Sequence, residues 1–253
     1  MSGTTGVRFD DGRLLVDDDG WVALVDTAAD PDPEAFAALL GAEQSSPVTS
    51  EVHWSLRAHI EASLGIDMVG RSSDGVAVGA SASSDGARGL LLLDTQPGRW
   101  DGGGAEVPAQ ERQVLPVLAT LLPISLLEMM QVGARRGLGL REAVTLPSSQ
   151  VAALLWRDSE VELPADAPAG QIAMLLQQES WRHWRVRVTG RLPDGELVED
   201  GLDVVVLRDG VLAIDAVGGD ELEIREVSPV PVLVRLVEAM RPGLVASRTP
   251  PPA

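Results

Sequence analysis

Residues 184–190 read WRVRVTG, a stretch in which apolar and polar side chains alternate. Trp184, Val186 and Val188 are apolar, and the residues between them are polar. A period of two residues is typical of a β-strand that buries one of its faces. The sequence therefore predicts a strand here, in the second half of the chain.

The neighbouring segments predict a helix before this strand, and three strands and a helix after it. Asp-Gly and Pro-Asp-Gly sequences separate the strands, and such sequences favour tight turns. Ser228 is a suitable helix cap, Pro229 suits the first helical turn, and Pro242 follows as a stop. The expected elements are a helix at 170–179, strands at 184–190, 202–207, 211–216 and 222–227, and a helix at 229–240.

A similar order of elements is predicted earlier in the chain. Pro108 should open a helix and Pro123 should stop it. The expected elements are a helix at 55–63, strands at 66–69, 76–80 and 90–93, a Ser/Gly-rich loop at 81–89, and a helix at 108–123. The two copies predict an α+β fold, with an antiparallel sheet, helical bundles and a pseudo-twofold internal duplication. A chance similarity between two α+β segments is the alternative.

The rest of the chain adds a hairpin and further helices. Apolar runs at 13–16 and 21–25 flank Asp17-Asp18-Asp19-Gly20, which favours a hairpin turn. Helices are expected at 31–41, 124–136 and 147–156. We therefore expect an N-terminal hairpin and helix region (1–54), a first α+β half (55–136), a second α+β half (137–247) that forms one compact unit with the first, and a disordered tail (248–253).

The composition excludes several classes of function. The 253 residues include no cysteine, which excludes disulfides and Cys-ligated zinc. All 20 basic residues are arginine, so a P-loop lysine and a Schiff base are excluded as well. The net charge of −18 would repel nucleic acid and anionic lipid, so we expect neither as a partner. We also expect no secretory signal and no stable membrane insertion, and the lack of Lys, Asn and Tyr indicates a GC-rich genome, as in actinobacteria.

No set of residues predicts a catalytic, cofactor-binding or metal site. His53 and His59 are six residues apart, which places them on different faces of a helix instead of the pairing that a helical zinc site uses. The nucleophile motif G-x-S-x-G does not occur. One alternative stays open, a hydrolase that uses Ser, Asp or Glu with His183 or His59. It requires a pocket that joins a histidine to an acid or a serine.

Five residues are candidates for contact with a partner protein. Trp100 lies in a predicted loop, where an exposed aromatic side chain can anchor an interface. Asp85 and Arg88 lie in the predicted loop at 81–89, which joins two strands and can adapt to a partner. Met129 and Met130 could form an adaptable apolar surface if they are exposed, and they belong to the core if they are not.

The duplicated order of elements resembles the EspG family, the secretion-associated chaperones of ESX (type VII) secretion systems. The similar segments are 89–94 with 113–118, 143–147 with 151–155, and 215–227 with 229–240. The resemblance implies a cytoplasmic, non-enzymatic chaperone or adaptor that keeps secreted helical substrates, of the PE/PPE or WXG-like kind, soluble before export. A monomer or homodimer is expected. A self-associating structural component of a secretion machine is a further alternative, motivated by the apolar segment around Met129.

Overall fold

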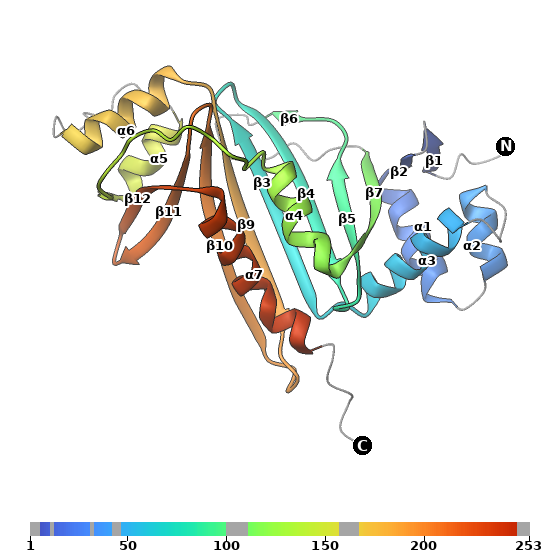
Figure 1. Ribbon diagram of the computed structural model, residues 1–253. Helices are drawn as coiled ribbons and strands as arrows, with labels where there is room; N and C mark the ends of the chain where they lie inside the picture. The colour runs from blue at the N-terminus through green and yellow to red at the C-terminus, as the bar shows by residue number, and fades with distance from the viewer. Residues whose placement is uncertain are drawn as a thin grey trace.

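The computed structural model describes residues 6–10, 13–30, 33–41, 47–99, 111–156 and 167–246. Within these residues the strands form one 12-stranded antiparallel sheet (Figure 1). The strands are β1 (Val7–Asp10), β2 (Arg13–Val16), β3 (Leu64–Ser72), β4 (Val76–Ser84), β5 (Arg88–Asp94), β6 (Gly98–Arg99), β7 (Arg112–Leu118), β8 (Val144–Pro147), β9 (Trp181–Arg191), β10 (Leu197–Leu207), β11 (Val211–Gly218) and β12 (Glu221–Val227).

The helices cover the sheet unevenly. They are α1 (Asp18–Ala29), α2 (Pro33–Leu40), α3 (Pro47–Ile60), α4 (Leu122–Met129), α5 (Ser148–Trp156), α6 (Ala167–Gln178) and α7 (Pro229–Ala246), with a 3-10 turn at Ala119–Leu121. In Figure 1, α4 and α7 lie across the front of the sheet, whereas α1–α3 and α5–α6 lie at its two ends. Among the described helices, none is long and apolar enough to cross a membrane.

The order of strands is symmetric about the pair β3–β9. Moving outward, β4, β5, β7 and β2 follow on one side, and β10, β11, β12 and β8 follow on the other. Each half places a helix before its first central strand (α3 or α6) and another after its fourth strand (α4 or α7). The expected α+β fold with one antiparallel sheet and a pseudo-twofold arrangement is therefore confirmed.

Three apolar cores follow from this layering. Because successive residues of a strand point to opposite faces, Leu91 joins the core under α4 and α7, whereas Leu90 and Leu92 join the core under α1–α3. The same alternation in β10 places Val204 in the first core and Val205 in a third core, under α5 and α6. The helices at the two ends therefore cover the face of the sheet opposite α4 and α7.

The second half of the chain is largely as expected. The strands expected at 184–190, 202–207, 211–216 and 222–227 are confirmed within β9, β10, β11 and β12. The helix expected from 229 is α7, but Pro242 lies inside it and does not stop it. In the first half, the strands expected at 66–69, 76–80 and 90–93 lie within β3, β4 and β5.

The expected hairpin between 13–16 and 21–25 is wrong in its second strand. Asp18 begins α1, and the Asp17 carboxylate accepts a hydrogen bond from the Gly20 backbone N–H at 2.8 Å, which caps the helix. Asp18 and Asp19 then lie in the first turn, where the helix dipole favours negative charge. The strand at 13–16 pairs instead with β1.

Residues 112–118 form strand β7 and not the expected helix. Their partners are β5 and β2, which are distant in sequence and hold the segment extended. Pro123 occupies the first turn of α4 and does not stop a helix, and α4 is shorter than the helix expected at 124–136. Pro108 lies outside the described residues, as does the tail at 248–253.

The loop expected at 81–89 is mostly strand. Ser81–Ser84 belong to β4, and Arg88 begins β5, so only residues 85–87 connect them. The Ser84 hydroxyl donates to the Arg88 carbonyl at 2.6 Å and accepts from the Gly86 N–H at 2.9 Å, which closes a tight turn. The domain boundary expected at residue 54 stays a prediction.

Candidate functional site

The middle of the sheet is uncovered on the face opposite α4 and α7. In β9, the alternation that buries Trp184, Val186 and Val188 turns the intervening residues toward this face. We call this surface the open face. Its side chains come from the two central strands and from β10, namely Asp67, Val69 and Arg71 of β3, His183, Arg185, Arg187 and Thr189 of β9, and Asp203 of β10.

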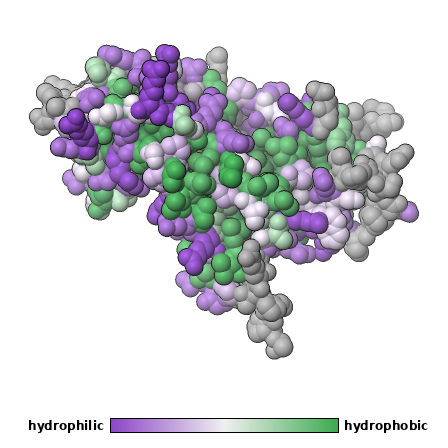
Figure 2. Space-filling model, in the orientation of Figure 1, coloured by the Kyte–Doolittle hydropathy of each residue, from purple (hydrophilic) through white to green (hydrophobic). Residues whose placement is uncertain are grey.

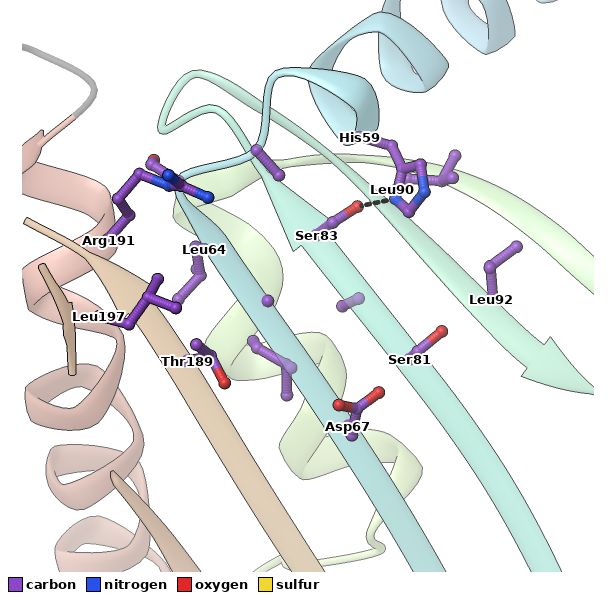
Figure 3. Close-up of a pocket in the computed structure, with 15 residues that line it drawn as sticks. His59, Leu64, Asp67, Ser81, Ser83, Leu90, Leu92, Thr189, Arg191 and Leu197 are labelled. Atoms are coloured by element: carbon purple, nitrogen blue, oxygen red, sulfur yellow. Dashed lines mark hydrogen bonds between the residues drawn. The ribbon is translucent and has the colours of Figure 1, made fainter. Parts of the chain in front are cut away.

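Two cavities on the open face meet at Asp67. The smaller has a volume of about 410 Å³ and lies between β3, β4, β9 and the end of α3 (Figure 3). The larger has a volume of about 530 Å³ and lies between β3, β9, β10 and α5. We call the larger cavity the trough. Because Asp67 lines both, the two cavities are neighbours along the sheet.

One wall of the trough is charged. The Arg185 Nε donates to the Asp203 Oδ1 at 3.2 Å, and the His183 Nε2 lies 3.4 Å from the same oxygen. Burial alone would raise the pKa of Asp203, but His183 and Arg185 outweigh it, so the pKa of this carboxyl is lowered and it stays ionised. Burial also lowers the pKa of Arg71, which nevertheless stays charged.

The other wall of the trough is apolar. Helix α5 begins directly after β8 and contributes Val151, Ala152 and Leu155. The Ser148 N–H at its start donates to the Asp220 carbonyl at 2.8 Å, which fixes the helix against the β11–β12 turn. Trp181 of β9 also lines the trough, and its indole N–H donates a hydrogen bond to the Leu176 carbonyl at 2.7 Å. A trough with one charged and one apolar wall suits an amphipathic partner.

The smaller cavity contains a histidine–serine pair. The His59 Nδ1 lies 2.7 Å from the Ser83 Oγ, joined by the hydrogen bond drawn in Figure 3. Burial lowers the pKa of His59, so the imidazole is neutral at neutral pH. The pocket that the hydrolase alternative requires is therefore present. Ser83 itself is only 7% exposed.

Asp85 and Arg88 lie at the β4–β5 turn and not in the trough. The Asp85 Oδ1 accepts hydrogen bonds from the backbone N–H groups of Ala87 and Arg88, both at 2.8 Å, so this carboxylate holds the turn. The Arg88 guanidinium lies 5.0 Å from the centre of the Trp54 ring, a cation–π contact. These residues line a separate cavity of about 580 Å³.

The two methionines differ in burial. Met130 is 0% exposed and belongs to the core, so it does not meet the condition set for a partner contact. Met129 is half-buried and packs against the same core. Figure 2 shows apolar side chains gathered over α4 and α7. Ile124 of α4 and Val234 of α7 are each about half exposed. Trp100 lies outside the described residues.

Several residues of interest were missed from the sequence. Trp54 lies in α3, just before the helix expected at 55–63, and is 52% exposed where it contacts Arg88. The sequence showed Arg185 and Arg187 as polar positions of an alternating strand. They are exposed because no helix covers this part of the sheet. No sequence pattern indicated that α5 forms the apolar wall of the trough, because the strands that face it are far away in sequence. Among the described residues, no cluster of three or more metal-ligating side chains is present.

The fold is EspG-like, in agreement with the order of its elements. The chain is similar to the solved structure of the Mycobacterium tuberculosis type VII secretion system chaperone EspG5, in complex with a PE25–PPE41 dimer. The TM-score is 0.55, with 11% sequence identity, over 91% of this chain and 96% of that chain. No model of a protein family and no curated protein matches the sequence.

Proposed function

We propose that this protein is a chaperone or adaptor of a type VII secretion system, and that it holds a secreted helical protein, of the PE/PPE or WXG-like kind, before export. One observation carries the proposal, which is the shared fold over almost the whole of both chains. The proposal includes a cytoplasmic location and a monomeric or homodimeric state. It takes the open face as the surface that receives the substrate.

The trough supports this proposal by its chemistry. The apolar wall from α5 can bury apolar side chains of a partner, and such burial supplies most of the affinity in protein interfaces. The charged wall from β3 and β9 can orient the partner without supplying much affinity. At about 530 Å³, the trough has room for a few side chains and not for a whole helix. The substrate would therefore present the edge or tip of a helical hairpin.

The proposal is tested by co-expression with a PE/PPE heterodimer and, separately, with a WXG-like dimer. We expect a stable complex with one of them on size exclusion with light scattering. We also expect the bound substrate to stay soluble on warming, under conditions in which the free substrate aggregates. Free substrate that is equally soluble alone, or the absence of a complex with either dimer, would exclude the proposed role.

Hydrolysis is the second candidate function, and the contact between His59 and Ser83 is the observation that favours it. In this case the neutral His59 would accept the Ser83 hydroxyl proton as Ser83 Oγ attacks the ester carbonyl, and would return it to the alkoxide that leaves when the ester C–O bond breaks. Water would then hydrolyse the acyl-serine and release the acid. Turnover of p-nitrophenyl acetate that Ser83→Ala abolishes, and that the neighbouring Ser81→Ala leaves intact, would support it. A rate equal to the background hydrolysis would exclude it and leave the pair with a structural role, joining α3 to the sheet.

A further inference from the structure

Arg185 and Arg187 form a pair of cations along one edge of the trough. Both are exposed and both line it. They are two residues apart on β9, so their backbone positions are separated by about 6.6 Å along the strand. In a chain with a net charge of −18, the trough is lined by three arginines and two aspartates. The trough thus has a small excess of basic side chains within an acidic protein.

The guanidinium groups of this pair have donors to spare. Arg185 uses its Nε to bind Asp203, which leaves four of the five N–H donors of its side chain for a ligand. Within the described part of the chain, no carboxylate lies within 4.0 Å of the Arg187 guanidinium, although Asp67 is its register partner on β3. The Asp203 carboxylate contacts His183 and Arg185, both through Oδ1, and makes no ion pair with Arg187.

Glycine keeps the space beside Arg187 open. Gly201 is the register partner of Arg187 on β10, and it has no side chain to cover the guanidinium. A Cβ at position 201 would lie 2.4 Å from the Val186 carbonyl oxygen, so a larger residue does not fit there. On the β10 side Arg187 lines a further cavity of about 460 Å³, where Glu199, Asp200 and Asp203 are among the acidic neighbours.

The spacing of the pair matches acidic side chains on a helix. Residues three or four apart on a helix lie about 5–6 Å from each other, close to the separation of the two arginines. Carboxylates are the groups that arginine binds best, through two parallel N–H···O bonds. The apolar wall lies opposite, so the same helix could place its apolar side against Ala152 and Leu155.

We propose that the docking helix of the substrate carries two acidic side chains one turn apart, which bind Arg185 and Arg187 while its apolar side contacts α5. This proposal rests on the proposed function, because it names the chemistry of the substrate that the trough receives. The protein's overall negative charge opposes an acidic ligand at long range. The contact therefore selects for acids at one position and not for an acidic protein as a whole.

The test uses three synthetic amphipathic helices labelled with fluorescein. They share one leucine face and carry, at its edge and one turn apart, two glutamates, two glutamines or two lysines. We expect the glutamate peptide to bind about tenfold more tightly than the glutamine peptide, because glutamine cannot form the charge-assisted hydrogen bonds with arginine. Arg187→Gln should abolish this preference, and Arg185→Gln should reduce it. Arg241→Gln, an exposed arginine of α7 on the other side of the sheet, should leave it unchanged.

A chemical block separates this proposal from the proposed function. The chain has no cysteine, so Ala152→Cys gives a single site in the trough for a bulky maleimide. Equal binding of the glutamate and glutamine peptides, with both displaced by the block, would overturn the acidic preference and leave docking in the trough intact. Binding of the glutamate peptide that the block does not affect would overturn both. A lack of binding by all three peptides would also overturn the acidic preference.

Discussion

Replacing Gly70 with alanine should destabilise the joint between the two halves. In β3, a Cβ at position 70 would lie 2.4 Å from Cζ3 of Trp184 and 2.6 Å from Cε3 and Cη2 of the same ring. Carbon atoms pack best at about 3.5–4.0 Å, so the overlap is about 1 Å. Trp184 is 2% exposed in the core under α4 and α7, so its ring has no space into which to withdraw. We expect Gly70→Ala to lower the free energy of unfolding by about 1–3 kcal/mol, the usual effect of overpacking a core.

Gly65→Ala is the matched control, because it lies on the same strand but on the open face. Its Cβ would meet only the Thr189 carbonyl oxygen, at 4.0 Å. Urea unfolding followed by circular dichroism measures both variants. The double variant Gly70→Ala/Trp184→Phe should recover part of the loss, since phenylalanine lacks the ring atoms that clash. Equal unfolding free energies for Gly70→Ala and Gly65→Ala would refute the argument.

Two further predictions concern the N-terminal helices. Burial lowers the pKa of His59 and, together with the charge of Arg57, that of His53, both from an ordinary value of 6.5. Their contribution to stability is therefore complete above about pH 6.5 and is lost as the pH falls below it. We expect a double variant with asparagine at both positions to show a flatter pH dependence of unfolding between about pH 5 and 7, and an unchanged slope would contradict the shifts. For the cap of α1, Asp17→Ala should cost about 1 kcal/mol in urea unfolding, whereas Asp17→Asn should cost less, and equal losses would argue against capping.

The elements that could be predicted from the sequence are those with local signals. The strands within β9–β12 show alternating apolar and polar residues and are separated by turn sequences such as Asp-Gly. Both signals are local and do not depend on distant residues. The apolar residues of the segment 112–118 fit a helix as well as a strand. Its pairing with β5 and β2 makes it a strand. The Asp17–Gly20 segment fits both a turn and a helix start, and the carboxylate of Asp17 decides in favour of the helix.

The candidate site was less predictable than the fold, for a related reason. The trough takes its walls from β3, β9, β10 and α5, which the sequence separates widely. Its location depends on which part of the sheet the helices leave uncovered, and no local pattern reports that. The partner-contact residues expected from local chemistry lie elsewhere, with Met130 in the core and Asp85 in a turn.

Site-specific labelling distinguishes a substrate that binds in the trough from one that binds elsewhere on the protein. Single cysteines at Ala152 in the trough and at Val234, which is 48% exposed on the outer side of α7, would carry the same bulky maleimide. Complex formation with the PE/PPE or WXG-like dimer is then measured for each labelled protein. We expect the label at 152 to prevent the complex and the label at 234 to leave it intact. A complex that survives the label at 152, or that is lost with the label at 234 alone, would contradict binding in the trough.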